Sequence, residues 1–291
     1  MSFPSFLKRR RDVVLGGALG LAATLGAGAA WAQAPAGPLT LGVLPNISAR
    51  VLLTHYQPMR EYLQQTLGRP VEVVTANDFR AFAQATREGK YDMIVTAPNL
   101  GRMAQVDSRW TPIAQYEPGI PALLVTAASN REAAVAQLRG KSLALGNPQS
   151  LVALVGLRWL GGQGLQQGRD FQVVRTPNDD SLGAVILNGE APFAIMSMGE
   201  FRAKPDALRQ ALRVVSEIAT VPGFLVMTHP TMTAADRQKL GDAMLALPAA
   251  EAGWRFFGLS GFTNVRRVDD RELAALDAFV DVTRRSLFGD N

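Results

Sequence analysis

The chain has 291 residues, of which 47% are hydrophobic and 19% are charged, a composition that suits one large globular domain or two smaller ones. It contains no cysteine, which excludes a disulfide framework, a thiolate metal site and a thiol nucleophile. The formal net charge of +5 falls to +2 once residues 1–32 are set aside, so the sequence does not indicate a basic surface for nucleic acid.

Residues 1–32 have the order of an export signal. Basic residues 8–11 precede an uncharged run rich in Gly, Ala, Leu and Val, which ends in the segment Ala-Trp-Ala. We expect cleavage after Ala32 and delivery to the periplasm. The run is about long enough to serve as an uncleaved membrane anchor, although its five glycines make it weakly apolar. The pair Arg10-Arg11 leaves twin-arginine export open beside the general secretory route.

A strand, helix, strand, helix, strand pattern begins near residue 39. Residues 41–48 (LGVLPNIS) run from a strand-like segment through a Pro/Asn break to a serine, where a helix is expected to start. Residues 68–95 continue with a strand ending in Val-Val, an Asn-Asp pair, a helix-length segment and a second strand. This order predicts a small parallel sheet covered by helices. The apolar residues of the first helix have helical spacing: Leu52, Tyr56, Met59, Leu63 and Leu67.

The same pattern recurs about 100 residues later. Residues 168–195 repeat the Gly-Arg, the Val-Val, the Asn-Asp pair and the central glycine of residues 68–95. Upstream, residues 143–150 (LALGNPQS) match residues 41–48. Chance similarity between α/β segments is the simpler alternative, but agreement across two linked segments favours two similar lobes.

Two long extended segments lie between and after the copies. Residues 111–129 and 212–230 are apolar and interrupted by Pro and Gly, which suits strands that cross between lobes. Helices starting near Thr233, Glu251 and Asp270 would return to the first lobe, the last of them with apolar spacing through Leu287. We therefore expect lobe one in residues 38–118 and 219–291, lobe two in residues 119–218, and a hinge between them.

Loops at the carboxyl ends of strands line the ligand crevice of a doubly wound sheet. Free N–H groups and the positive dipole end of each following helix favour an anionic or carbonyl-bearing ligand. Helix capping is the simpler role for any single Asn, Asp or Ser there, and Tyr116 suits hinge packing as well as ligand stacking. Arg50 and Arg102, just inside such helices, suit an anion or simple solvation. The candidate ligand-binding residues are Asn46, Ser48, Asn77, Asp78, Asn99, Tyr116, Gln149, Ser150, Asn178 and Asp179.

Catalytic motifs are missing from the sequence. The two histidines, His55 and His229, have no metal-ligand spacing, and there is no nucleophile elbow, phosphate-binding loop or dinucleotide fingerprint. We expect no enzyme activity, no cofactor and no metal. An exported two-lobed protein of this kind is more naturally a binder that closes around a solute.

Six segments, taken together, carry a family resemblance over residues 39–230. They are LGVLPNIS, YQPMREYLQQTLGRPVEVV, EGKYDMIVTAPN, LRGKSLALGNPQS, GLRWLGGQGL and GFLVMTHP. In these the chain resembles the substrate-binding proteins of phosphate, phosphite and phosphonate ABC transporters. The resemblance implies an α/β type II periplasmic binding fold, with two pseudo-repeated doubly wound lobes joined by two crossing strands. It also implies an oxyanion-bearing solute between the lobes and an inner-membrane ABC permease as partner.

The chain departs from that family at the helix start of lobe two. Members usually carry a hydroxyl run close to Ser-Thr-Ser-Gly there, whereas residues 150–153 read Ser-Leu-Val-Ala. Two hydroxyl donors are thus replaced by apolar side chains, and hydrogen bonds to a charged group are worth about 1.5–3 kcal/mol each. Backbone N–H groups remain, which leaves open a phosphonate, another oxyanion or a less charged solute.

Our leading hypothesis is a monomeric periplasmic solute-binding component of an ABC importer, with no nucleic-acid partner. A periplasmic accessory protein that presents a ligand to a membrane histidine kinase is the alternative. A cytoplasmic effector domain of a transcription regulator shares the general fold. The export signal and the lack of a helix-turn-helix before residue 39 argue against this third reading.

Overall fold

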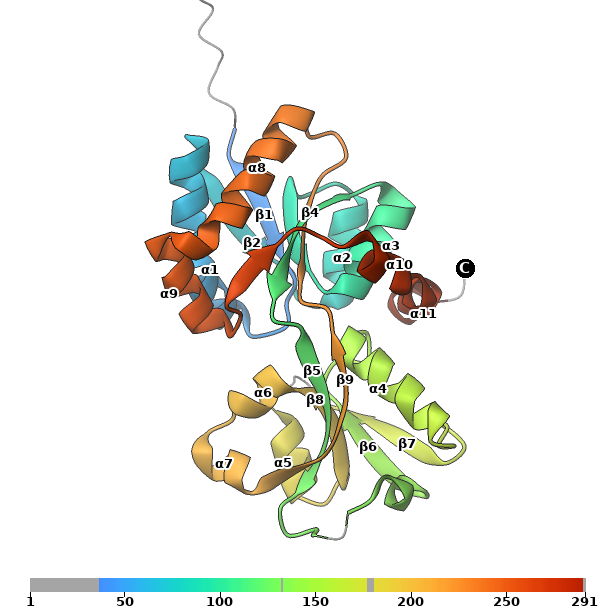
Figure 1. Ribbon diagram of the computed structural model, residues 1–291. Helices are drawn as coiled ribbons and strands as arrows, with labels where there is room; N and C mark the ends of the chain where they lie inside the picture. The colour runs from blue at the N-terminus through green and yellow to red at the C-terminus, as the bar shows by residue number, and fades with distance from the viewer. Residues whose placement is uncertain (1–36, 132, 177–180, 290–291) are drawn as a thin grey trace, which may run out of the picture. The chain divides into compact units, whose positions relative to one another are not determined.

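The computed structural model describes residues 37–131, 133–176 and 181–289, so the predicted export signal lies outside the described residues. These residues form two mixed β-sheets, each with helices on both faces (Figure 1). The predicted α/β fold with two lobes is confirmed. Within the described part of the chain, no helix is both long and apolar enough to cross a membrane.

The sheet of lobe one has the strand order β11-β4-β10-β3-β1-β2. Helices α1, α8 and α9 cover one face, and α2, α3, α10 and α11 cover the other. Its strands are β1 (Leu39–Val43), β2 (Val71–Thr75), β3 (Met93–Thr96), β4 (Thr111–Glu117), β10 (Leu225–Thr228) and β11 (Asn264–Arg266). Its helices are α1 (Ala49–Leu67), α2 (Phe79–Arg87), α3 (Pro98–Ser108), α8 (Ala234–Ala246), η3 (Leu247–Ala249), α9 (Glu251–Ser260), α10 (Asp270–Ala275) and α11 (Asp277–Phe288).

The sheet of lobe two has the order β7-β6-β8-β5-β9. Helix α4 covers one face and α5 the other. The strands are β5 (Ile120–Ala127), β6 (Lys141–Leu145), β7 (Phe171–Arg175), β8 (Phe193–Ser197) and β9 (Leu212–Val221). The helices are η1 (Val135–Leu138), α4 (Leu151–Gly162), α5 (Leu182–Leu187), α6 (Met198–Arg202) and α7 (Asp206–Gln210).

The internal repeat is present in the strand registers. Leu41 pairs with Val73 of β2 and Met93 of β3, and its counterpart Leu143 pairs with Val173 of β7 and Phe193 of β8 in the same parallel geometry. The glycines aligned by the repeat share a left-handed backbone, which glycine adopts without steric cost. Their φ angles are 69° at Gly68, 82° at Gly168, 67° at Gly89 and 77° at Gly189.

The repeat alone would predict purely parallel sheets, but both sheets also contain antiparallel pairs. Strand β10 runs antiparallel to β3 and β4, and β5 runs antiparallel to β8 and β9. Strands β5 and β10 have this direction because the chain enters each of them from the other lobe. Each long apolar segment is thus split between the two sheets. The chain changes sheet between Glu117 and Ile120 and returns between Val221 and Leu225.

The two crossings touch each other, backbone against backbone. A Cβ on Gly223 would lie 2.1 Å from the carbonyl oxygen of Tyr116, and one on Gly119 would lie 2.8 Å from that of Val221. Ile120 pairs directly with Val221, so β5 and β9 run side by side from the crossing into lobe two (Figure 1). Only glycine permits so close an approach of the two chain segments.

The C-terminal helices begin near the expected residues. Thr233 caps α8, and α9 starts at Glu251. The last predicted helix is instead two helices, because the chain turns at Leu276, between α10 and α11. Leu276 itself is buried in the core of lobe one, which explains why the apolar spacing continues through the break.

Candidate binding site

The candidate site is formed by loops that follow the parallel strands of each sheet. Strands β1, β2 and β3 lead into α1, α2 and α3, while β6 and β8 lead into α4 and α6. Because these strands are parallel within each sheet, the helix N-termini gather at one edge of that sheet. Each such edge therefore presents free backbone N–H groups and positive dipole ends.

The first loop of lobe one holds Asn46 and Ser48. Asn46 is half-buried, and its backbone N–H donates to the carbonyl of Leu44 at 2.9 Å. Ser48 occupies the N-cap position of α1 and is exposed, but its side chain accepts no capping hydrogen bond. Plain capping therefore does not account for Ser48, and its hydroxyl suits a ligand.

The second loop of lobe one holds Asn77 and Asp78, and these two residues differ. Asp78 caps α2, because its carboxylate accepts a 2.7 Å hydrogen bond from the backbone N–H of Ala81. Asn77 is exposed beside it. The cap explains the presence of Asp78 without a ligand.

Asn99, in the first turn of α3, joins the two lobes. It is fully buried, and its Nδ2 donates to the carbonyl oxygen of Gln149 at 2.9 Å and to Oγ1 of Thr283 at 3.0 Å. Its Oδ1 has no hydrogen-bond partner among the described residues. Of the sequence-predicted site residues, the structure thus brings Asn99 and Gln149 into direct contact.

The polar residues 147–150, between β6 and α4 of lobe two, form a capped turn. The N–H of Gln149 donates to Oδ1 of Asn147 at 3.0 Å, and Oγ of Ser150 accepts from the N–H of Ala153 at 3.1 Å. Leu154 donates the first bond of α4 to the carbonyl of Ser150, at 3.0 Å. The N–H groups of Leu151 and Val152 are therefore the backbone donors that α4 offers. Asn178 and Asp179 lie outside the described residues.

Tyr116 packs in the core of lobe one. Its side chain is 1% exposed, and its ring lies 5.1 Å from that of Phe262 and 5.6 Å from that of Phe256. Burial raises the pKa of its hydroxyl, which donates to Sδ of Met59 at 3.8 Å. Of the two roles left open for Tyr116, the structure shows packing beside the crossing, because its face of β4 is covered by α1 and α9.

The two arginines proposed near the loops have different surroundings. Arg102 forms a 2.6 Å ion pair with Asp277 and a 2.6 Å hydrogen bond with Gln105, so it joins α3 to the start of α11. Its hydrogen bond lowers the pKa of Asp277. Arg50 is exposed in the first turn of α1. Arg50 is therefore the better placed of the two to attract an anion.

The sequence analysis did not predict one further strand-end loop, which follows β8. Ser197 ends β8 at the place where Ala97 follows β3 in the first copy. Its Oγ accepts from the N–H of Glu200 at 3.1 Å, and its own N–H donates to Oε2 of Glu200 at 2.9 Å, forming a capping box. The Ser-x-x-Glu spacing of residues 197–200 was the available signal.

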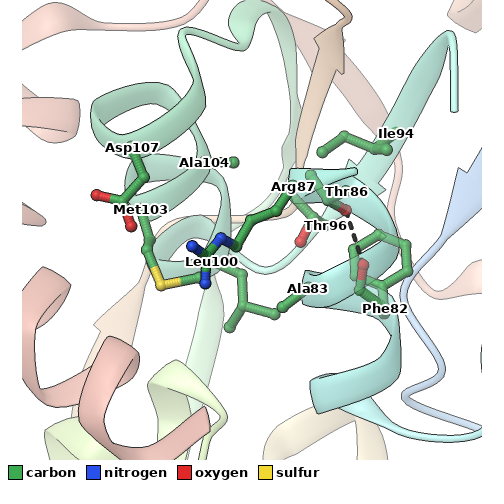
Figure 2. A pocket seen from close by; sticks show the side chains of 10 residues that line it. All are labelled: Phe82, Ala83, Thr86, Arg87, Ile94, Thr96, Leu100, Met103, Ala104 and Asp107. Carbon is green, nitrogen blue, oxygen red and sulfur yellow. Dashed lines mark hydrogen bonds between the residues drawn. The ribbon is translucent and has the colours of Figure 1, made fainter. Parts of the chain in front are cut away.

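Two hollows adjoin helices α2 and α3 of lobe one. One is a partly open pocket between α2 and α3 with about 10 Å³ of free volume, room for about one water (Figure 2). The other, of about 550 Å³, is lined by α11 and the ends of α2 and α3. Arg284 in the larger hollow pairs with Asp107 at 2.7 Å and with Asp281 at 2.6 Å. The charge of Arg284 is thus already balanced by two carboxylates.

Comparison with known proteins gives one family. The model of the family described as "ABC transporter, phosphonate, periplasmic substrate-binding protein" matches residues 41–273. This range includes every candidate residue named above.

Solved structures share the fold at low sequence identity. PhnD1 from Prochlorococcus marinus, in complex with methylphosphonate, is 14% identical with a TM-score of 0.75, covering 87% of this chain and 99% of that one. A binding-protein component of an ABC phosphonate transporter from Pseudomonas aeruginosa is 16% identical with a TM-score of 0.74, covering 87% and 90%. The periplasmic aliphatic sulphonate-binding protein SsuA from Escherichia coli is 15% identical with a TM-score of 0.61, covering 88% and 94%.

Proposed function

The chain belongs to the periplasmic substrate-binding proteins of phosphonate ABC transporters, and on this premise we propose that it captures a small oxyanion-bearing solute, phosphonate-like in shape, between its two lobes. The family consists of binding components rather than enzymes. The observation that carries the proposal is the set of strand-end loops of both lobes, each followed by a helix N-terminus. Such termini favour negative charge.

Lobe one supplies side chains suited to an oxyanion. The hydroxyl of Ser48 is not used as a helix cap, and Arg50 places an exposed positive charge two residues further on. Asn77 is exposed at the neighbouring loop. We propose that these three residues contact the solute, together with the first-turn N–H groups of α1.

Lobe two supplies mainly backbone donors. In its first helical turn, Leu151 and Val152 stand where family members usually have hydroxyl residues. Missing hydrogen bonds to a charged group weaken binding by about 1.5–3 kcal/mol each. We therefore expect this protein to bind a dianion less tightly than a hydroxyl-rich member, and to accept monoanions of the same shape.

A thermal-shift panel tests the proposal. The exported chain would be melted with phosphate, phosphite, methylphosphonate, methanesulfonate and acetate. A ligand at 100 times its dissociation constant stabilises the fold by about 2.7 kcal/mol, which raises the melting temperature by roughly 5–10 °C in a protein of this size. Arg50→Gln should reduce the shift, and Arg271→Gln, an exposed arginine on α10 away from the candidate loops, is the matched control. No shift with any member of the panel would contradict the proposal.

We further propose that the partner is an inner-membrane ABC permease, that the protein acts as a monomer, and that its signal is cleaved after Ala32. Mass spectrometry of the periplasmic fraction would give the mature N-terminus. Crosslinking in the native membrane, followed by identification of the captured protein, tests the partner. Capture of a histidine kinase in place of a permease would favour the sensory alternative.

A further inference from the structure

An apolar face of α4 in lobe two packs into the core of lobe one. Leu151 is 3% exposed and belongs to the same buried cluster as Leu44, Ala97 and Leu100 of lobe one. Val152 and Val155 pack against this cluster as well. The residues that replace the hydroxyl run thus contact protein.

Polar and aromatic contacts continue the same interface along α4. Before the helix, Gln149 accepts the 2.9 Å hydrogen bond from Asn99, and its Nε2 lies 3.4 Å from the carbonyl oxygen of Ser286. Two turns later, the guanidinium of Arg158 lies 5.7 Å from the ring centroid of Phe279 on α11. Contacts between the lobes therefore extend from residue 149 to residue 158.

The spacing of these contacts forms a continuous stripe. Leu151, Val155 and Arg158 are related by i, i+4 and i+7, which places them on one face of a helix. Ala153 and Leu160 face the core of lobe two instead. A helix that covered only its own sheet would need one apolar stripe, whereas α4 has two. Separating the lobes would expose the second stripe to water at a cost proportional to its apolar area.

We propose that residues 149–158 form an interlobe latch with α3 and α11, which holds the lobes together in the absence of solute. The latch consists of the apolar contacts of Leu151, Val152 and Val155, the Asn99–Gln149 hydrogen bond and the Arg158–Phe279 contact. Solute then meets a site whose two halves are already in place, so a preformed site takes the place of the closure around the solute that the sequence suggested. Because apparent affinity falls with the fraction of competent protein, the latch compensates for the reduced donor set of lobe two. This consequence for affinity rests on the proposed function, whereas the latch itself does not.

Distance measurement between the lobes tests the latch without any solute. The chain has no native cysteine, so Glu72→Cys and Gln172→Cys would carry the only spin labels, at exposed and equivalent positions of β2 and β7. We expect one narrow distance distribution that methylphosphonate shifts by less than about 2 Å. Val155→Asp should add a population displaced by more than that amount. A broad solute-free distribution that narrows on adding methylphosphonate would overturn the latch.

The matched control is Leu157→Asp. It puts the same charge on the same helix, but Leu157 is partly buried against the cluster of lobe two alone. It should leave the distance unchanged, and a shift equal to that of Val155→Asp would contradict the proposal. If Val155→Asp does not fold, Val155→Thr keeps the volume and should displace a smaller population in the same direction.

Solute affinity gives a second, separable readout. If Val155→Asp lowers the latched fraction to about a tenth, the dissociation constant for methylphosphonate should rise about tenfold. A protein that binds no member of the panel would refute the proposed function, yet the solute-free distances would still test the latch. A solute that binds equally well to wild type and to a variant with displaced lobes would refute the role of the latch in affinity.

Discussion

The starts of α1 and α4 occupy equivalent places in the two copies of the repeat, yet their surroundings are opposite. Ser48 and Ser150 both precede a helix, after strands with the same register. Ser150 caps its helix and the next residue, Leu151, is buried; Ser48 does not cap, and Ala49 and Arg50 are exposed. The repeat therefore determines where the loops lie, while the side chains on the loops differ between the two lobes. Lobe one offers polar groups, and lobe two offers contact with lobe one.

Exchanging the residues that follow the two serines should have the largest effect. Leu151→Ala removes a buried side chain and should lower the free energy of unfolding by about 2–3 kcal/mol. Ala49→Leu adds an exposed side chain at the equivalent place and should change it by less than about 0.5 kcal/mol. Urea unfolding followed by circular dichroism measures both. Equal losses would show that the two helix starts are not different environments.

Two glycines aligned by the repeat should also differ. Alanine in a left-handed backbone costs about 1–2 kcal/mol, which is the whole effect expected for Gly189→Ala because its surroundings are open. At Gly89 the new Cβ would lie 2.7 Å from Nε2 of His229, whose ring also packs edge-on against Trp110. Gly89→Ala should therefore cost roughly 2–3 kcal/mol. Thermal melts of both variants test this, and a larger loss for Gly189→Ala would contradict it.

The two serines themselves should separate stability from binding. Ser150→Ala removes a helix cap and should cost about 1 kcal/mol in unfolding free energy. Ser48→Ala removes no cap, so the melting temperature should hardly move, but affinity for an oxyanion should fall about tenfold or more. Calorimetric titration with the best solute of the panel, beside a thermal melt, gives both values. If Ser150→Ala lowered the affinity and Ser48→Ala lowered the stability, lobe two rather than lobe one would supply the hydroxyl ligand.

Lowering the pH should have a smaller effect on stability, and this effect should arise in only one of the two copies of the repeat. Hydrogen bonds from Arg169 and from the N–H of Gln166 lower the pKa of Asp170, which also pairs with Arg139. The equivalent residue of lobe one is Pro70. A lowered folded-state pKa means that the stabilisation is present above the ordinary aspartate pKa and is lost as the pH falls through the folded value. Asp170→Asn should thus lower the melting temperature at pH 7, and the difference should shrink at pH 3. A constant difference would show that the ionised carboxylate is not responsible.

Periodicity and the repeat predicted the architecture because they report burial. Leu52, Tyr56, Met59 and Leu63 are buried on α1 as their spacing requires. The crossing strands followed from length and Pro/Gly interruptions. The strand-end loops followed from the order of elements, and so did Ser150 as a cap.

The partners of the site residues were not predictable in the same way. Asn99 contacts Thr283, and Arg102 contacts Asp277, across more than 170 residues of chain, where no local pattern relates them. Tyr116 and Ala114 share one face of β4, but only the assembled sheet shows that this face is covered by helices. Such contacts depend on tertiary packing, which propensity and spacing do not contain.

The position of β10 has a consequence for the order of folding. This strand lies between β3 and β4, although it follows them by more than a hundred residues. The edges of β3 and β4 that face β10 therefore stay unpaired until residues 225–228 are available, whereas the sheet of lobe two is complete at residue 221. Pairing across such long loops is slow, because the chain loses the entropy of loop closure before the strand contact stabilises the sheet. As the chain is synthesised, the sheet of the second lobe would therefore be completed before the sheet of the first lobe.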